Sequence, residues 1–346
     1  MLNFYDFSYE LLQEELANRG QSNYRATQLF KWVYKKQVTD FSEMSDISKV
    51  FREELLSDFY FPQRKVHTKQ VSSDGTIKLL IELEDGALVE AVLMRYSYGN
   101  VVCVTSQLGC NMACTFCASG LLRKRRDLTT GEMLIQVLIM NDLLREEGNG
   151  ERVTHVVVMG TGEPFDNYDN VLNFIRLINH PYGLEIGARH LTISTCGIPD
   201  KIKKFAHEGL QVNLAISLHA ANNKTRSRLM KINRTYPLEA LMEAIKYYEK
   251  MTNRRVTYEY ILLKDVNDSL ADADELSDLI RGTNGYVNLI PFNPVEELPY
   301  QRTPNNRVSA FLDRLIKRGI TTTVRKEFGT DIDAACGQLR AKEENS

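Results

Sequence analysis

Three cysteines lie close together in the stretch SQLGCNMACTFCASG, residues 106–120. They are Cys110, Cys114 and Cys117, separated by gaps of three and then two residues. A metal site closed by cysteine normally uses four thiolates, so three would leave one iron of a four-iron cluster open to a substrate or cofactor. The spacing alone also allows a zinc site completed by a distant histidine, or no metal site at all.

A second unusual loop is VVVMGTGEP, residues 156–164. Glycines on both sides of Thr161 would let the backbone approach a ligand closely, and Glu163 brings a carboxylate to the same turn. A dinucleotide-binding loop is the alternative. It is disfavoured because the third glycine of GxGxxG is missing and Pro164 follows the acid.

The composition is that of an ordinary globular chain. Its 346 residues are 43% hydrophobic and 25% charged, with a formal net charge of -2, so contact with nucleic acid would depend on local patches. We expect one large α/β domain and a small accessory domain. No apolar run of about 18 residues is present, which argues against a membrane partner.

The N-terminal pattern is an acidic amphipathic helix that lacks the features of a secretory signal, so we expect a cytoplasmic protein. In such a reducing compartment, a tight cysteine cluster indicates metal binding or catalysis rather than a disulfide framework.

The elements that must position these residues follow from periodicity. Apolar positions such as Leu12, Leu16 and Leu29 recur at helical spacing over residues 1 to about 60. Within 65–95, Asp85-Gly86 separates two β-rich runs, which predicts a β-hairpin.

From about residue 100, strand and helix patterns alternate. We expect strands at 101–107, 153–160, 189–197, 211–220, 256–263 and 286–292. Between them, one helix should begin at Thr129 with Glu132 as a capping box, and another at Pro237. A last helix near 304–318 precedes the strand 320–326. About six βα units predict a parallel sheet that forms an open, partial barrel, because a closed barrel needs eight.

In parallel sheets the working residues gather at the carboxyl ends of the strands. The cysteine loop follows the first expected strand, and Glu163 follows the second. Ser194 ends the third strand and Asn293 follows the sixth. In the fourth strand, Asn213, Ala215, Ser217 and His219 share one face by alternation. This small, polar face fits the lining of a solvated cofactor cavity, although an ordinary half-exposed strand would show the same pattern.

The CxxxCxxC spacing, with Phe116 before the last cysteine, resembles the motif of the radical S-adenosylmethionine (SAM) superfamily. MGTGEP resembles the GGEP motif of that superfamily. The resemblance implies a [4Fe-4S] cluster whose fourth iron binds the amino and carboxylate groups of SAM, and Glu163 as acceptor of the SAM ammonium group.

The whole chain resembles the RlmN/Cfr family of radical SAM RNA adenosine methyltransferases. The matching stretches are EAVLMRYSYGNVVCVTSQLGCNMACTFCASG, MGTGEPFDN, LTISTCGIP, NLAISLHA, LLKDVNDS, IPFNP and FGTDIDAACGQL. Lys231 departs from the family pattern, which usually has proline there. The resemblance implies a helical RNA-binding domain at 1–62, a β-hairpin linker at 63–98, and a radical SAM partial barrel at 99–340 that ends in a catalytic cysteine loop.

The resemblance also implies a reaction with two SAM molecules per turnover. One SAM methylates Cys336. The second is cleaved to a 5'-deoxyadenosyl radical, which removes a hydrogen from that methyl group so that the carbon adds to the base. Glu90 accepts a proton, and Cys103 releases the product through a transient disulfide with Cys336.

By the same matching, the cluster ligands are Cys110, Cys114 and Cys117, and the SAM contacts are Gly162, Glu163, Ser194, Ser217, Leu218, His219 and Asn293. Cys196 is interpreted as a buried structural thiol.

The implied substrates are adenine 2503 of 23S rRNA, methylated at C2, and adenine 37 of some tRNAs, with an electron donor such as flavodoxin or ferredoxin. The Cfr branch methylates C8 of the same rRNA base, but it has alanine where Pro164 follows the glutamate here. Basic residues at 121–126, and others beside aromatic residues in the N-terminal region, give direct but weak support for RNA contact.

Two alternatives belong to other classes. A glycyl-radical-activating enzyme would need neither Cys103 nor Cys336. A metal-stabilised RNA-binding protein without catalysis would bind zinc and cleave no SAM.

Overall fold

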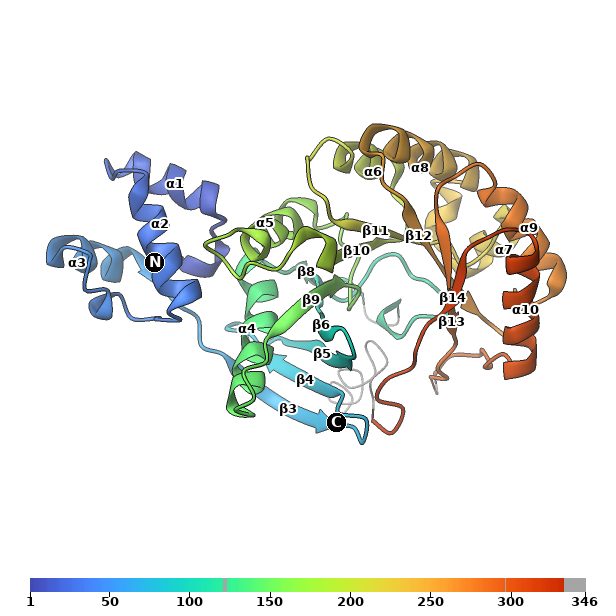
Figure 1. Cartoon of the computed structure of the whole chain (residues 1–346), viewed down its shortest axis with the longest axis horizontal. Helices are drawn as coiled ribbons and strands as arrows, with labels where there is room; N and C mark the ends of the chain where they lie inside the picture. The colour runs from blue at the N-terminus through green and yellow to red at the C-terminus, as the bar shows by residue number, and fades with distance from the viewer. Residues whose placement is uncertain (121–122, 296, 333–346) are drawn as a thin grey trace.

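The computed structural model describes residues 1–120, 123–295 and 297–332 (Figure 1). Within them, the main sheet has ten strands. The parallel ones are β6 (Gly99–Cys103), β9 (Val153–Val158), β10 (Leu191–Thr195), β11 (Asn213–Ser217), β12 (Val256–Leu262), β13 (Tyr286–Pro291) and β14 (Thr322–Val324). The antiparallel ones are β3 (Lys65–Val71), β4 (Ile77–Glu82) and β5 (Leu88–Tyr96). Their order across the sheet is β14-β13-β12-β11-β10-β9-β6-β5-β4-β3.

Helices connect successive parallel strands and cover the outer face of the curved sheet (Figure 1). They are α4 (Thr130–Glu146), α5 (Tyr168–Asn179), α6 (Pro199–Phe205), α7 (Asn223–Leu229), α8 (Leu238–Thr252), α9 (Leu270–Ile280) and α10 (Asn305–Lys317). Right-handed crossovers of this kind allow each strand to join its neighbour in parallel. The predicted α/β fold, an open partial barrel of about six βα units, is confirmed.

The parallel strands end earlier than their sequence patterns suggested. The strand expected at 101–107, for example, leaves the main sheet after Cys103. There, the backbone N–H of Thr105 donates to the side-chain oxygen of Gln136, on α4, at 2.8 Å. The backbone thus leaves the sheet and forms the loops at the mouth of the barrel.

The predicted hairpin forms between β4 and β5 around Asp85-Gly86. Its strands also belong to the main sheet, because β5 pairs with β6 and β3 pairs with β4. Residues 65–96 therefore extend the main sheet by three strands. The proposed domain limits of 1–62, 63–98 and 99–340 stay predictions.

The N-terminal region is helical, as predicted, and lies to one side of the sheet (Figure 1). It contains α1 (Tyr9–Asn18), α2 (Tyr24–Phe30) with a π-helical continuation at Lys31–Lys35, and α3 (Lys49–Asp58). Short 3-10 turns lie at Phe4–Asp6 and Phe41–Glu43. A parallel pair of two-residue strands, β1 (Leu2–Asn3) and β2 (Phe59–Tyr60), was not predicted, because two residues show no alternation.

This region is attached to the main domain by polar contacts. The carboxylate of Asp6 accepts a hydrogen bond from the backbone N–H of Gly131 at 2.8 Å, at the N-terminus of α4 where an anion is favoured. Arg64 pairs with Asp142 near the other end of the same helix at 2.5 Å. The N-terminal domain and α4 are therefore held at two separate points.

Helix starts agree closely with the sequence. Thr129 is the N-cap of α4 and forms a full capping box with Glu132. Pro237 is the N-cap of α8 rather than its first helical residue. In the part of the chain that the structure describes, no helix is both long and apolar enough to cross a bilayer.

We expect Thr129→Ala to lower the free energy of unfolding by about 1 kcal/mol, because the backbone N–H of Glu132 in the first turn of α4 loses the hydroxyl that caps it. Chemical denaturation monitored by circular dichroism measures this change. Thr129→Ser keeps the hydroxyl and should retain most of the stability. Equal losses for the two variants would show that the methyl group, not the cap, is responsible.

Candidate active site at the carboxyl ends of the strands

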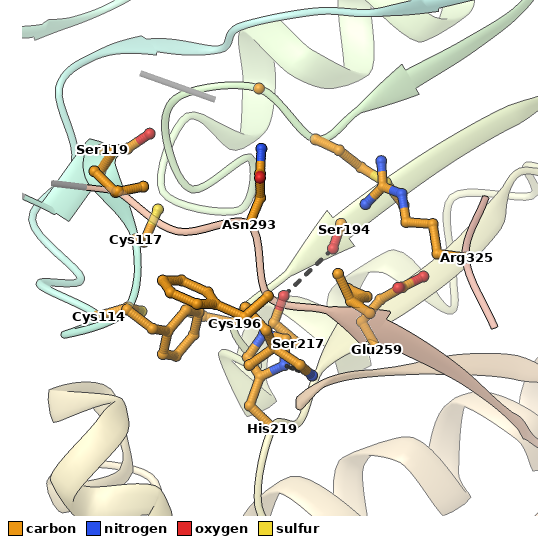
Figure 2. Close-up of a pocket in the computed structure, with 18 of the residues that line it drawn as sticks. Cys114, Cys117, Ser119, Ser194, Cys196, Ser217, His219, Glu259, Asn293 and Arg325 are labelled. Carbon is orange, nitrogen blue, oxygen red and sulfur yellow. Dashed lines mark hydrogen bonds between the residues drawn. The ribbon is translucent and has the colours of Figure 1, made fainter. Parts of the chain in front are cut away.

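A cavity of about 370 Å³ opens at the carboxyl ends of the parallel strands (Figure 2). Its wall contains most of the residues that the sequence assigned to chemistry. These are Cys110, Cys114, Cys117, Gly162, Glu163, Ser194, Ser217, His219 and Asn293. The sheet thus brings together residues that are up to 183 positions apart in sequence, as expected for strand ends in a parallel sheet.

The cysteine loop is held at its base and near its middle. A two-stranded antiparallel pair, β7 (Gln107–Leu108) and β8 (Arg126–Asp127), joins its two ends. In the middle, the backbone N–H of Thr115 donates to the carbonyl of Leu229 at 2.9 Å, and the Thr115 hydroxyl lies 2.7 Å from that of Tyr300. The loop between Cys110 and Cys117 is therefore fixed to the barrel wall opposite its own strand.

The thiols of this loop lie in a largely apolar environment. Burial raises the pKa of Cys110 to about 12 and raises that of Cys114 well above its usual range, because a thiolate is disfavoured away from water. Bound iron would reverse this preference, since a metal deprotonates a coordinating thiol. Within the described ranges, no three Cys, His, Asp or Glu side chains converge on one point as a single metal ion would need. A four-iron cluster has no such requirement because its thiolates bind different irons, so the donor set fits a cluster.

Glu163 follows β9 and is almost fully buried. Its carboxylate accepts hydrogen bonds from the backbone N–H of Phe165 at 3.0 Å and of Cys196 at 2.7 Å. Its own N–H donates to the side-chain oxygen of Gln107 at 2.8 Å. Burial raises the pKa of Glu163, and the two N–H donors oppose that effect. An ammonium group would be a suitable partner for such a fixed, desolvated carboxylate.

The glycines flanking Thr161 pack closely against the segment that follows β6, and the approach of their backbone to a ligand stays a prediction. A Cβ atom at Gly160 would lie 2.6 Å from the carbonyl oxygen of Val104. Gly162 has a φ of +116°, and a Cβ there would lie 2.7 Å from the Cβ of Gln107. The turn that carries Glu163 therefore tolerates no side chain at these two positions.

Ser194 and Ser217 are neighbours on β10 and β11, and their hydroxyl oxygens are 3.5 Å apart (Figure 2). His219 follows in a left-handed backbone conformation with a φ of +59°. Its Nδ1 accepts a hydrogen bond from the backbone N–H of Ile261 at 3.1 Å, so the ring proton is on Nε2. Burial, and then the nearby charge of Arg226, lower the pKa of His219 to about 3. The imidazole is therefore a neutral N–H donor.

Leu218 does not line the cavity, unlike its neighbours Ser217 and His219. Its side chain is fully buried in the main hydrophobic core, not in the cavity wall. Its backbone N–H donates to the carbonyl of Glu259 at 3.0 Å, and its carbonyl accepts from Arg226 at 3.2 Å. The side chain of Leu218 thus anchors β11 in the core, and a contact with SAM stays a prediction.

The predicted catalytic residues Glu90 and Cys103 lie beside the cavity on β5 and β6. Cys103 is the register partner of Val92, which lines the cavity, and Cys103 packs in the same cluster as Phe328. Glu90, two residues before Val92, forms an ion pair with the fully buried Lys78 at 3.1 Å. Cys336 lies outside the described residues.

Three residues of the site were missed by sequence reasoning: Gln107, Arg226 and Glu259. Glu259 lines the cavity from the middle of β12, and an acid within the apolar run VTYEYILL was a usable signal. Arg226 is fully buried and its guanidinium donates to the carbonyls of Cys196, Ser217 and Leu218. Nothing in its local sequence marks that position.

The predicted basic patches are partly neutralised. In 121–126, Lys124 pairs with Asp127 and Asp166, and Arg126 pairs with Asp85 and Glu132. Arg123 and Arg125 are exposed.

In the N-terminal region Trp32 and Tyr34 are buried, and Lys35 pairs with Glu185 at 2.6 Å. Both patches therefore offer fewer cations and rings to a phosphate backbone than the sequence suggested.

Comparison with known proteins agrees with this geometry. Residues 104–277 match the model of the radical SAM superfamily, and residues 2–60 match that of the ribosomal RNA large subunit methyltransferase N-terminal domain. The crystal structure of a radical SAM methyltransferase from Sphaerobacter thermophilus superimposes with a TM-score of 0.90 at 41% identity, covering 98% of this chain and 99% of that one. The chain thus has the fold of the radical SAM class.

Two curated relatives are similar over nearly the whole chain. Both are described as probable dual-specificity RNA methyltransferase RlmN. The one from Streptococcus pyogenes serotype M5 is 55% identical over 96% of this chain and 95% of its own length; that from Streptococcus thermophilus is 56% identical over 96% and 87%. The chain belongs to the RlmN family of radical SAM RNA methyltransferases. Enzymes of this family use a [4Fe-4S] cluster and two SAM molecules per turnover.

We expect Gly162→Ala to weaken SAM binding roughly 10- to 100-fold, because strain at positive φ and the contact with Gln107 displace Glu163. Equilibrium dialysis with labelled SAM measures the change. Gly148→Ala is the matched control, since Gly148 also has a positive φ but no atom within 4 Å of an added Cβ. Equal SAM binding by both variants would contradict this role of the turn.

His219 should make stability depend on pH. The unfolded chain protonates this imidazole below about pH 6.5, whereas the folded protein keeps it neutral down to a pKa of about 3. Between these values the unfolded state binds the extra proton, so stability is lost as the pH falls.

The loss amounts to about 1.4 kcal/mol per pH unit well below pH 6.5. Because His219→Gln does not titrate, the stability advantage of the wild type over this variant should shrink by that amount per unit from pH 5.5 to 4.5. Urea unfolding at several pH values measures the difference; a constant difference would mean that the folded protein accepts the charged ring.

Proposed function

We propose that this chain methylates C2 of adenine in RNA, at adenine 2503 of 23S rRNA and at adenine 37 of some tRNAs, in the cytoplasm. The observation that carries the proposal is the similarity over 96% of the chain to relatives described as dual-specificity RNA methyltransferases. The predicted ligand-binding residues other than Leu218 line one cavity, which supports a single active centre.

In this proposal Cys110, Cys114 and Cys117 hold the [4Fe-4S] cluster, and Glu163, Ser194, Ser217, His219 and Asn293 bind SAM. When bound, the cluster and SAM supply one-electron chemistry and the methyl carbon. Such chemistry is needed because C2 of adenine is an electron-poor carbon without a nucleophilic lone pair. The role of the protein is to position SAM and the base and to exclude water from the cavity.

Two cysteines have separate roles in the proposed methyl transfer. Cys336 carries the methyl group, and Cys103 releases the product from Cys336 as a transient disulfide forms between them. Phe328 packs with Cys103, and Thr330 lines the cavity. Cys336 is six residues beyond Thr330 in the sequence and lies outside the described residues.

Contacts of the preceding segment support this arrangement. The backbone N–H of Gly329 donates to the carboxylate of Asp74 at 2.9 Å, and Asp331 accepts from the N–H of Ser73 at 2.9 Å. These hydrogen bonds lower the pKa of both carboxyl groups. The turn between β3 and β4 therefore anchors the chain just before the segment that carries Cys336.

Glu90 is the proposed proton acceptor. Its ion pair with Lys78 is almost completely buried, and its backbone carbonyl accepts a hydrogen bond from the Thr105 hydroxyl at 2.8 Å. Lys78 thus holds the carboxylate at a fixed place on the inner face of the sheet. We further propose that a small redox protein, flavodoxin or ferredoxin, supplies the electrons.

We expect 2-methyladenosine in 23S rRNA and tRNA after anaerobic reaction with the reconstituted enzyme, SAM and a reductant, measured by mass spectrometry of nucleosides. Cys336→Ala should abolish the product, and Cys103→Ala should accumulate a covalent protein–RNA adduct because the link is not resolved. Cys196→Ala is the control for loss of a buried thiol that has no assigned role in the transfer.

Other products would change the assignment. Formation of 8-methyladenosine would move the chain to the Cfr type of reaction. SAM cleavage without any methylated adenosine would refute the proposed substrates.

A further inference from the structure

A row of polar side chains crosses the inner face of the barrel beyond the predicted SAM contacts. Its members are register partners on four adjacent strands: Ser217 on β11, Glu259 on β12, Asn288 on β13 and Thr323 on β14. Only Ser217 has a role in the proposed function. The other three form a connected polar group without an assigned role.

Glu259 is the member of this row that lines the cavity beside Ser217. Only 5% of its surface is exposed. Its Oε2 accepts a hydrogen bond from the side-chain N–H of Asn288 at 2.9 Å, and the oxygen of that amide accepts from the Thr323 hydroxyl at 3.1 Å. The amide of Asn288 is thereby fixed in orientation, and so is the carboxylate that it holds.

Burying the ionised carboxylate of Glu259 is unfavourable in free energy, because the group loses its hydration. Burial raises the pKa of Glu259, and the neighbouring charge of Arg325 and the hydrogen bond from Asn288 oppose the effect only in part. An apolar residue at this position would avoid the cost of desolvation. A ligand that donates a hydrogen bond to the carboxylate would explain why an acid stands here.

The position of Glu259 separates it from the cysteine loop. Figure 2 shows Cys114 and Cys117 on one side of the cavity, Glu259 and Arg325 on the other, and Ser194 and Ser217 between them. SAM bound at the cysteines and the two serines would occupy the first side and the middle. The second side is then left for the substrate.

This second side also adjoins the residues proposed to handle the substrate. Tyr96 packs in the same cluster as Cys103, and burial raises the pKa of its hydroxyl. The ring of Phe328 packs against that of Tyr96 in a tilted arrangement, with 4.5 Å between the ring centroids, and Phe328 lines the cavity. Glu259 therefore lines the same cavity as Phe328, the ring that packs with Cys103.

We propose that Glu259 binds the exocyclic 6-amino group of the target adenine, an inference that rests on the proposed function. A carboxylate only accepts hydrogen bonds, and the amino group only donates them. On the adenine ring, N1 separates the amino carbon from C2, so a carboxylate at the amino group fixes the ring while leaving C2 uncovered. Guanine has a carbonyl oxygen in place of this amino group and would be repelled.

The test compares two RNA stem-loops that differ at one nucleotide, the target adenosine or purine riboside, which lacks the 6-amino group. We expect the wild type to favour the adenosine RNA by roughly 10- to 100-fold in kcat/KM, the effect of a hydrogen bond to a charged group.

In Glu259→Gln the amide oxygen should pair with the N–H of Asn288 and turn the NH₂ group toward the adenine. This variant should therefore lose the preference for adenosine, act on purine riboside at nearly the wild-type rate, and cleave SAM without RNA as before. Glu239→Gln, at an exposed position on α8, is the matched control and should keep the preference.

Other results would overturn the inference. If Glu259→Gln raises the KM for SAM and slows both RNAs equally, the carboxylate binds the adenosine part of SAM instead. If both RNAs slow equally at unchanged KM for SAM, its role is structural. If the wild type methylates neither RNA, the proposed function fails and the inference falls with it. The parallel assay of SAM cleavage distinguishes this result from a protein that lacks its cluster.

Discussion

The mouth of the barrel depends on one buried cation, the guanidinium of Arg226. Its hydrogen bonds reach the carbonyl that follows β10, at Cys196, and two carbonyls at the end of β11. Through α7, which carries Arg226, the chain continues to Leu229, whose carbonyl holds the cysteine loop at Thr115. Because the N–H of Cys196 also holds Glu163, the same network connects the cysteine loop to the acid proposed to bind SAM.

This cation also sets the electrostatics of the cavity. Burial lowers the pKa of Arg226 to about 10, which leaves it charged at neutral pH. A buried charge is tolerated only where hydrogen bonds and opposite charges offset its desolvation. The carbonyls supply the hydrogen bonds. The carboxylate of Glu163, and thiolates in the cluster-bound state, would supply the opposite charge. The same cation helps to keep His219 neutral, so that the ring donates a hydrogen bond without adding a second positive charge.

Periodicity and motif spacing predicted the parallel half of the fold and the residues that meet at its mouth. They succeeded there because alternation within a strand decides which side chains face inward, and parallel strands place their carboxyl ends together. They failed for Arg226, whose partners are carbonyls brought together only by the finished fold. They also overestimated the basic stretch at 121–126, because its ion pair from Arg126 to Asp85 joins residues 41 positions apart.

The hairpin of β4 and β5 is a second example of pairing that the local sequence does not predict. Asp85-Gly86 correctly predicted a turn, but nothing local revealed that β5 would pair with β6 and extend the main sheet. This pairing bears on the proposed function. It places Glu90 and Val92, the register partner of Cys103, on the inner face beside the cavity.

The extension also brings the turn between β3 and β4 to Gly329 and Asp331, at the start of the segment that leads to Cys336. The three antiparallel strands extend the sheet beside the cavity, where β5 carries Glu90 and pairs with β6 at Cys103. In the proposed reaction, an acid and a thiol would approach the base from this side, while the parallel strands would hold SAM and, through Glu259, the base itself.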